Sequence, residues 1–273
     1  MEFEGIMKKM PTESVDGEVQ YFYPNTEKGL INELLGQQIR LKFLDKISCL
    51  NCGNTTKKTF GDGMCYKCFS SAPEAAPCII RPELCEAHLG KGRDIEWEEN
   101  HHNQPHVVYL ALSSSIKVGV TRAKQIPYRW LDQGANAAII LAEVPYRQLA
   151  GEIEVFLKDF YTDKTSWQAM LKNHVSEANL LDEKDDAAGQ LPEELQDFIS
   201  ERDEVFEFKY PVLEYPSKTT SVKLDKMPEF HGILSGIKGQ YWMFSDGRVI
   251  NWRNHGGYHV AIEKSKQANP TLF

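Results

Sequence analysis

The sequence predicts an α+β protein built from three parts that differ in their hydrophobic pattern. The first third of the chain holds all six cysteines, four of them in two Cys-x2-Cys pairs. Residues 107–173 alternate strand-like and helix-like runs, whereas short alternating runs broken by glycine follow residue 205. We therefore expect a cysteine-rich N-terminal part, a small mixed α/β domain and a small C-terminal β-barrel.

The N-terminal part, residues 1–104, opens with two strand-like runs at 19–23 and 39–44. Between them, Leu30, Ile31, Leu34 and Leu35 form an amphipathic turn. These short elements offer little apolar surface of their own. We expect them to pack on the cysteine-rich segment that follows.

Four cysteines of this part have the spacing of a zinc ribbon. Cys49 and Cys52 form one Cys-x2-Cys pair, and Cys65 and Cys68 form a second pair after twelve intervening residues. Each pair lets two thiolates converge on a tetrahedral ion, and nearby glycines supply the backbone freedom for such turns. Two disulfides are the alternative, but no signal peptide is evident. The sequence predicts a closed, structural Zn²⁺ site.

A second group of potential ligands lies just beyond the ribbon. Cys78, Cys85 and His88 are followed by several histidines, of which His102 completes the predicted set. Thiolates and imidazoles are suitable ligands for a second Zn²⁺. The irregular histidine spacing leaves the fourth ligand open, and buried free cysteines with exposed histidines are the alternative. With three protein ligands and a bound water, such a site could be hydrolytic.

The predicted α/β domain spans residues 105–175 and contains three strands, at 107–112, 116–120 and 138–142. Pro127 suits the first turn of a helix, and Gly134 suits its end. A second helix follows Pro145, because apolar residues recur there at helical spacing. These residues are Leu149, Ile153, Phe156, Leu157 and Phe160.

The order of chemical groups in this domain resembles the GIY-YIG nuclease superfamily. Val107-Val108-Tyr109 resembles the first signature and Lys117-Val118-Gly119 the second, and Arg129 and Glu154 lie on the two helices. The resemblance covers about 65 of the 273 residues. It implies that Tyr109, Lys117, Arg129 and Glu154 surround one phosphodiester, with Mg²⁺ or Mn²⁺ held at Glu154.

The implied chemistry is physically coherent. A carboxylate can hold a metal ion on the scissile phosphate, an arginine can neutralise developing charge, and a tyrosine can orient or deprotonate water. Glu152 competes with Glu154 for the metal-binding role. In the alternative interpretation, Tyr109 is a half-buried strand aromatic, and Arg129 and Glu154 form a surface ion pair.

Over most of its length, the chain also resembles an uncharacterised bacterial family that carries an N-terminal zinc ribbon. The resemblance rests on the cysteine knuckles, on Pro-Glu-Leu-Cys-Glu-Ala-His at 82–88 and on Lys-Val-Gly-Val-Thr-Arg at 117–122.

Residues 176–204 are expected to form an acidic linker with one helix. The stretch from Glu177 to Glu204 carries eleven acidic residues against Lys184 and Arg202, whereas the net charge of the whole chain is −8. The rest of the chain is thus close to neutral, which permits a nucleic-acid partner. The linker could also dock a protein partner.

The predicted barrel, residues 205–273, combines basic and aromatic residues on short strands. Such residues could stack on bases and contact phosphates, although they equally often fill the core of a small barrel. No apolar run is long enough to span a bilayer, and reduced cysteines are typical of the cytoplasm. We expect a cytoplasmic zinc protein that acts on nucleic acid, with no membrane contact. A non-catalytic nucleic-acid-binding protein and a protein-interaction adaptor are the alternatives.

Overall fold

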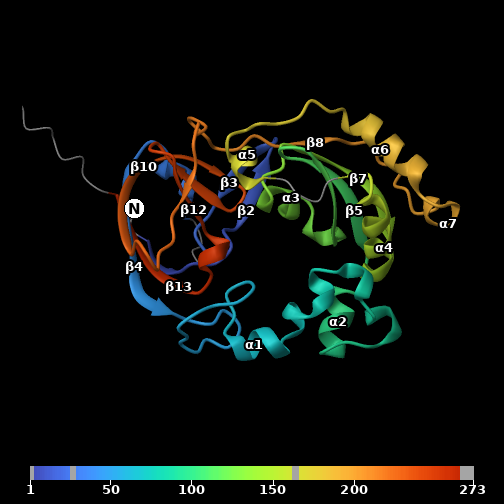
Figure 1. Ribbon diagram of the computed structural model, residues 1–273, viewed down its shortest axis with the longest axis horizontal. Helices are drawn as coiled ribbons and strands as arrows, with labels where there is room; N and C mark the ends of the chain where they lie inside the picture. The colour runs from blue at the N-terminus through green and yellow to red at the C-terminus, as the bar shows by residue number, and fades with distance from the viewer. Residues whose placement is uncertain (1–2, 25–28, 162–165, 265–273) are drawn as a thin grey trace, which may run out of the picture. The chain divides into compact units, whose positions relative to one another are not determined.

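The structure is a computed structural model that describes residues 3–24, 29–161 and 166–264 (Figure 1). The chain forms two compact units. Unit 1 combines Met1–Cys68 with Tyr210–Phe273, and unit 2 is the continuous segment Phe69–Lys209. The units therefore do not follow the four predicted segments one by one, because both ends of the chain contribute to unit 1.

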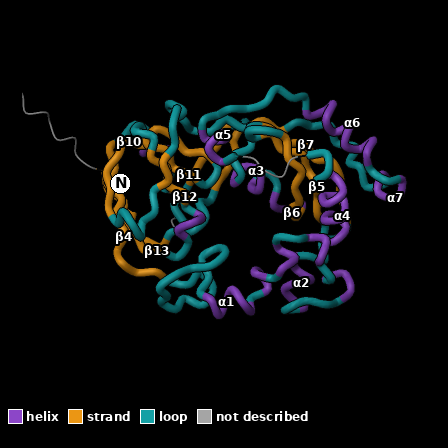
Figure 2. Tube along the Cα trace, viewed as in Figure 1, coloured by secondary structure: helices purple, strands orange, loops and turns teal. Residues whose placement is uncertain are grey.

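Unit 1 is built around a seven-stranded sheet whose strands appear in orange in Figure 2. Their spatial order is β1 (Phe3–Ile6), β13 (Tyr258–Lys264), β4 (Gln38–Ile47), β10 (Glu229–Lys238), β11 (Tyr241–Phe244), β12 (Arg248–Asn251) and β9 (Thr220–Ser221). Neighbouring strands are antiparallel except for β12 and β9. The strands β2 (Thr12–Val15) and β3 (Glu18–Tyr21) form a separate hairpin, and two short 3₁₀ helices, η1 (Ile31–Leu34) and η7 (Arg253–His255), complete the described part of this unit.

The prediction of a C-terminal β-barrel is wrong. The sheet is open, with β1 and β9 at its two edges. The N-terminal strand β4 lies between β13 and β10, so Leu41 pairs with both Ile262 and Phe230. Alternating runs predict strands but not their partners. Sequence patterns therefore missed the pairing of the two ends of the chain.

The core of unit 1 is rich in aromatic side chains. The ring of Phe3 is stacked on that of Tyr23, with centroids 4.3 Å apart, and Trp252 contacts both rings. Trp242 packs against Trp252 at 4.9 Å. These aromatic side chains come from the N-terminal and C-terminal segments of unit 1, so both segments are needed to form its core.

Unit 2 contains a four-stranded antiparallel sheet in the order β6 (Ile116–Arg122), β5 (His106–Leu112), β7 (Ala137–Val144) and β8 (Phe206–Glu207). The first three strands and the helices α3 (Tyr128–Asp132) and α4 (Arg147–Leu157) lie where the sequence predicts them. Its other helices are α2 (Ile95–His101), α5 (Trp167–Leu171), α6 (Leu180–Gln190) and α7 (Glu193–Gln196), and α1 (Tyr66–Ser71) spans the boundary between the units. Four 3₁₀ turns precede α2, namely η2 (Pro73–Ala75), η3 (Pro77–Ile79), η4 (Pro82–Leu84) and η5 (Ala87–Leu89), and η6 (Ala123–Gln125) follows β6.

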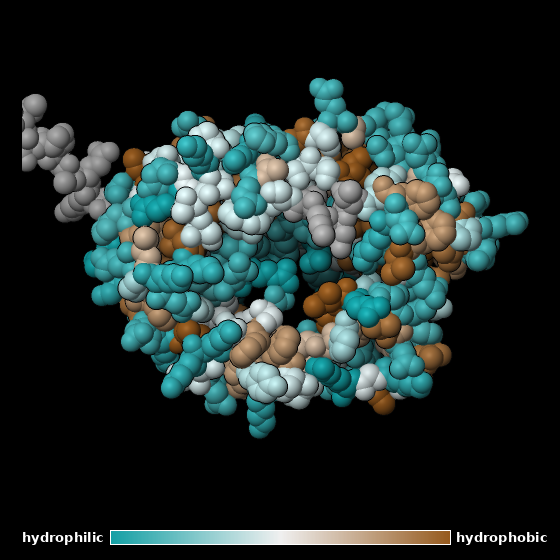
Figure 3. All heavy atoms as spheres, in the orientation of Figure 1, coloured by the Kyte–Doolittle hydropathy of each residue, from teal (hydrophilic) through white to brown (hydrophobic). Residues whose placement is uncertain are grey.

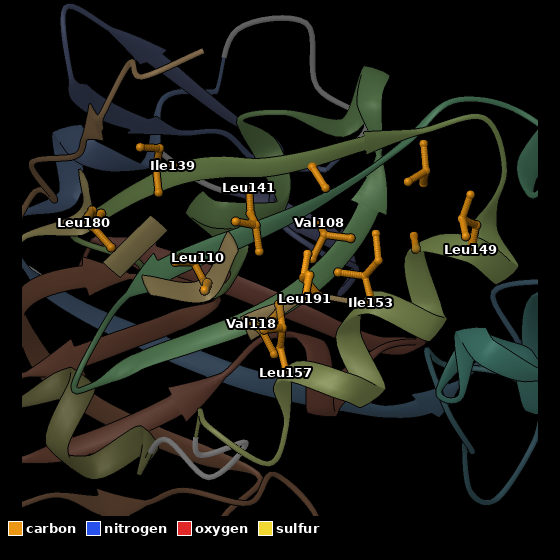
Figure 4. Close-up of a cluster of buried hydrophobic side chains, with 14 of the residues drawn as sticks. Val108, Leu110, Val118, Ile139, Leu141, Leu149, Ile153, Leu157, Leu180 and Leu191 are labelled. Atoms are coloured by element: carbon orange, nitrogen blue, oxygen red, sulfur yellow. The ribbon is translucent and has the colours of Figure 1, made fainter. Parts of the chain in front are cut away.

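The apolar face of α4 packs on this sheet. Leu149, Ile153 and Leu157 recur at helical spacing and are buried. In Figure 4, Ile153 and Leu157 lie beside Val108 of β5 and Val118 of β6. This packing fixes which face of α4 is turned away from the sheet. That other face carries Arg147 and Gly151.

The acidic segment is part of unit 2 and is not a solvated linker. Leu180, Ala187 and Leu191 are buried in the same core as α4. The ammonium group of Lys184 donates to the carbonyl oxygens of Ser200 and Arg202, at 2.7 and 2.8 Å, and contacts Asp203. Most acidic side chains face solvent, and hydrophilic side chains cover the right edge of Figure 3, where Figure 1 places α7. Within the described residues, no helix is both long and apolar enough to cross a membrane.

Candidate metal centres and candidate active site

Four of the predicted ligands come together in unit 1. The sulfur atoms of Cys49, Cys52, Cys65 and Cys68 all lie within 4.8 Å of one another. None of the six cysteines, all of which are described, forms a disulfide. Gly53 and Gly63 adopt left-handed φ angles of 76° and 87°, as tight cysteine turns require. This geometry fits a tetrahedral Zn²⁺ site with four thiolate ligands.

The local backbone favours a thiolate in this group. Burial opposes ionisation of Cys49, but the N–H groups of Cys52 and Cys65 point at its sulfur and lower its pKa to about 6. The Cys65 N–H donates to this sulfur at 3.1 Å. The segment that carries the four cysteines is anchored to η7 by Arg253, whose guanidinium makes two hydrogen bonds of 2.7 Å to the carboxylate of Asp62.

A second group of ligands is buried in unit 2. It consists of Cys78, Cys85, Glu98 and His102, whose ligand atoms also lie within 4.8 Å of one another. The Cys78 sulfur is 3.9 Å from Nδ1 of His102, and this nitrogen is in very close contact with the carboxylate of Glu98. The Cys78 thiol donates to Cys85, which lowers the pKa of Cys85 to about 4 and raises the pKa of Cys78.

This group contains three of the four predicted ligands and one residue that sequence analysis missed. His88 is not a member, because its ring is stacked on that of Tyr146 with centroids 4.5 Å apart. Glu98 takes the fourth position. Glu98 and His102 lie four residues apart at the end of α2, so their side chains share one face. That spacing is a sequence signal that could have identified Glu98.

The predicted catalytic tyrosine lies at the centre of a third polar group. Tyr109 is fully buried on β5, and its hydroxyl donates to Oε1 of Gln133 at 3.1 Å. Gly119 lies directly opposite on β6, and a Cβ atom there would be 2.6 Å from the tyrosine hydroxyl. Burial raises the pKa of Tyr109, whereas the neighbouring Arg129 opposes this shift. The hydroxyl is therefore held protonated at neutral pH.

Arg129 and Glu154, on the two helices, both act on this tyrosine, Arg129 at close range and Glu154 through its charge. Arg129 on α3 is close enough to hydrogen-bond to Tyr109, and its buried Nε atom has no hydrogen-bond partner among the residues that the structure describes. The Glu154 side chain on α4 is 13% exposed and lies 3.4 Å from the Lys158 ammonium. Its charge also acts on Tyr109. The structure thus places Tyr109 and Arg129 within hydrogen-bonding reach of each other and Glu154 within electrostatic range of Tyr109.

Lys117 and Glu152 are placed differently. Lys117 pairs with Ala111 on β5, two positions along the strand from Gly119. Lys117 therefore lies on the same face of the sheet as Tyr109, further along the strand. Glu152 is exposed and accepts a hydrogen bond from Gln148. The placement of the two glutamates favours Glu154 as the carboxylate of this group.

Two further residues, absent from the predicted set, connect the polar groups of unit 2. His106 at the start of β5 is fully buried, and its Nδ1 donates to the Gln104 carbonyl at 2.7 Å. Burial lowers the pKa of His106 to about 3, so the imidazole is neutral at physiological pH. The Arg147 guanidinium is close enough to interact electrostatically with Cys85 and with Glu154. His106 belongs to the run of histidines that follows Cys85 in the sequence, whereas no sequence motif marks Arg147.

Comparison with known proteins identifies the family. No curated protein and no solved structure matches the chain. A family model described as a protein of unknown function (DUF2797) matches residues 36–260, which include both groups of candidate metal ligands and the Tyr109 group. This match spans well over half of the 273 residues. The chain therefore belongs to the DUF2797 family.

Proposed function

We propose that the protein is a zinc-binding, metal-dependent phosphodiesterase that acts on nucleic acid through the GIY-YIG-like part of unit 2. The observation that carries this proposal is the group formed by Tyr109 and Arg129, which lies close enough to hydrogen-bond to it, with Glu154 near enough to act electrostatically on the same tyrosine. These three residues come from a strand and two helices that follow one another along the chain. Their order is the order implied by the resemblance to GIY-YIG nucleases.

Each residue has a role that its environment supports. Glu154 would hold Mg²⁺ or Mn²⁺ against a phosphate oxygen, and Arg129 would neutralise charge on the phosphate in the transition state. Because burial raises the pKa of Tyr109, its hydroxyl is suited to orienting the attacking water through a hydrogen bond. The four-cysteine group would hold a structural Zn²⁺ in unit 1.

The test is cleavage of labelled single- and double-stranded DNA and RNA with Mg²⁺ or Mn²⁺. Glu154→Ala should reduce the cleavage rate by about 100-fold or more, as should Arg129→Ala. Glu152→Ala is the matched control, since Glu152 is exposed two residues away on the same helix. It should leave the rate unchanged. Loss of cleavage in Glu152→Ala with full activity in Glu154→Ala would overturn the assignment.

A non-catalytic nucleic-acid-binding protein is the second candidate. The observation that favours it is the complete burial of Tyr109, which places its hydroxyl away from bulk solvent. In this case the wild-type protein should bind labelled DNA or RNA without cutting it under any metal condition. Glu154→Ala should then change neither binding nor cleavage.

A further inference from the structure

The second ligand group has the burial expected of a metal centre. The exposed fractions of Cys78, Cys85, Glu98 and His102 are all 8% or less. A buried carboxylate next to two thiols is costly unless a cation balances it. Helix α2 is fixed at its start by Asp94, whose side chain accepts from the Trp97 N–H at 3.0 Å. This cap starts the helix that carries Glu98 one turn later and His102 a further turn on.

A divalent ion in this group would have its charge completed by Arg147. Two thiolates, one carboxylate and a neutral imidazole around Zn²⁺ leave a single negative charge. The Arg147 guanidinium donates from Nε and Nη2 to the Cys78 carbonyl oxygen, both at 3.0 Å, and from Nη2 to that of Ile79 at 2.9 Å. It therefore supplies one positive charge beside the centre. It also fixes the backbone that carries one ligand.

The turns that carry Cys78 and Cys85 pack directly on α4. Gly151, one turn after Arg147, has no room for a side chain, because a Cβ atom there would lie 2.2 Å from the Glu83 nitrogen. Glu83 belongs to η4, the turn that leads into Cys85. Gly92 likewise packs on the Glu98 side chain, with 2.2 Å between the position of a Cβ and Cγ of Glu98. The opposite face of α4 is buried on the sheet (Figure 4).

We propose that Cys78, Cys85, Glu98 and His102 bind Zn²⁺, that Arg147 completes the charge of this centre, and that the bound ion holds α4 in place. His88 is not a ligand in this proposal. The centre is separate from the four-cysteine group. The proposal is independent of any cleavage of nucleic acid, because metal content, metal affinity and amide protection can each be measured without substrate.

Metal content of the purified full-length protein tests the ligand set. The wild type should contain two Zn²⁺ per chain, one for each group. Glu98→Ala should contain one, and so should the double variant Cys49→Ser/Cys52→Ser. His88→Gln is the matched control and should keep both. Two ions in Glu98→Ala, or one in His88→Gln, would overturn the assignment of Glu98.

Co²⁺ substitution provides a spectroscopic test that separates ligand loss from misfolding. In Cys49→Ser/Cys52→Ser, the remaining Co²⁺ should give thiolate-to-metal absorption from two sulfur ligands.

Arg147→Lys tests the role of the arginine, because it keeps the positive charge but loses the two-nitrogen fork. It should weaken Zn²⁺ binding by about 10- to 100-fold in competition with a chromogenic chelator. Unchanged affinity would exclude Arg147 as part of the centre.

Hydrogen exchange tests the link between the ion and α4. Loss of the second Zn²⁺ in Glu98→Ala should raise the exchange rates of amides 147–157, while amides of β10 keep their protection. Loss of the first Zn²⁺ in Cys49→Ser/Cys52→Ser should leave the α4 amides unchanged. Equal α4 protection in the wild type and in Glu98→Ala would show that the ion does not hold this helix.

Discussion

Tyr109 and Gly119 face each other across β5 and β6, and the pair shows how one missing side chain shapes the candidate active site. A Cβ atom at position 119 would lie 2.6 Å from the tyrosine hydroxyl and 2.7 Å from its Cζ atom. Real Cβ atoms do not tolerate such contacts, so either the ring or the strand must move. The Trp130 ring packs edge-on against Tyr109 at 5.8 Å and restricts that movement.

Gly119→Ala should therefore destabilise unit 2 by about 1–3 kcal/mol, a typical cost of overpacking. It should also break the hydrogen bond from Tyr109 to Gln133. Urea unfolding measures the first effect, and the rate of nucleic-acid cleavage or binding reports the second. An unchanged unfolding midpoint would show that the tyrosine ring can withdraw without cost.

Lys238 at the end of β10 is a buried cation that should leave a signature in the pH dependence of stability. Its ammonium lies 5.3 Å from the ring centroid of Tyr210 and 5.6 Å from that of Tyr215. Burial lowers the pKa of Lys238 to about 8. The unfolded chain binds this proton up to pH values near the ordinary lysine pKa of about 10.4. Between these values the unfolded state holds more protons than the folded state.

Stability of unit 1 should consequently rise from pH 8 to pH 10, by about 2 kcal/mol from this group. Lys238→Met should remove that rise, because methionine does not titrate. Urea unfolding of both proteins in parallel between pH 7.5 and 10 measures the difference, in which the contributions of all other titrating groups cancel. Parallel profiles for the two proteins would contradict a lowered pKa at Lys238.

Among single residues, the sequence predicted that cysteines and histidines would form metal sites, but it predicted less well which residues form each site. The four cysteines of unit 1 were predictable, because Cys-x2-Cys spacing alone places two sulfurs in one turn. The second centre was only partly predictable. His88 has a suitable spacing from Cys85, but Tyr146 stacks on its ring from a distant part of the chain. Arg147 donates hydrogen bonds to the backbone carbonyls of Cys78 and Ile79, and a pattern of side chains in the sequence does not predict contacts to backbone.

Helix α4 is the element on which the polar groups of unit 2 depend, and its two faces were not equally predictable. The apolar face with Leu149, Ile153 and Leu157 follows from helical spacing. The opposite face does not, because glycine at position 151 resembles a weak point of a helix when only propensity is considered. Glycine is required at this position because the backbone of Pro82 and Glu83 packs directly against it and leaves no room for a side chain.

Gly151→Ala should therefore be strongly destabilising, although alanine is the better helix former. A Cβ atom would lie 2.2 Å from the Glu83 nitrogen and 2.4 Å from the Pro82 carbonyl carbon, and backbone cannot move aside as a flexible side chain can. We expect a loss of about 2–3 kcal/mol in urea unfolding.

Gly189→Ala is the matched control within the same unit. Gly189 lies near the end of α6, and in the described part of the chain nothing approaches the position of its Cβ within 4 Å. This substitution should stabilise the protein by about 0.5–1 kcal/mol through helix propensity alone. Stabilisation by both substitutions would mean that the η4 turn does not pack tightly on α4.

The acidic segment illustrates how charge can conceal a core element. Its high density of carboxylates favours a solvated linker. Leu180 and Ala187 nevertheless share one buried face of α6, and Leu191, directly after the helix, is buried in the same core. Leu180 and Ala187 are seven positions apart, a helical repeat that a search for charge overlooks. Lys184, one of the two basic residues of the segment, is buried on the same helix.

At the scale of the whole molecule, the two units should differ in their dependence on the ends of the chain. Unit 2 is one continuous segment with its own core. In unit 1, β4 pairs with β10 and β13, and β1 pairs with β13, between residues that are 187 to 259 positions apart in the chain. Sequence patterns predicted most strands of both sheets. They could not reveal these partners, because strands of similar composition can pair in many combinations.

A chain that ends at residue 209 should therefore keep unit 2 folded and lose unit 1. It lacks β10 and β13, so β4 has no neighbour on either side, and Trp242 and Trp252 are missing from the aromatic core. Unit 2 retains β5, β6 and β7 with the buried Trp130. Hydrogen exchange should show protected amides in β5 and rapid exchange in β4, whereas the full-length protein protects both. Protection of β4 in the truncated chain would mean that the N-terminal segment folds without the C-terminal strands, and loss of protection in β5 would mean that unit 2 needs unit 1 to fold.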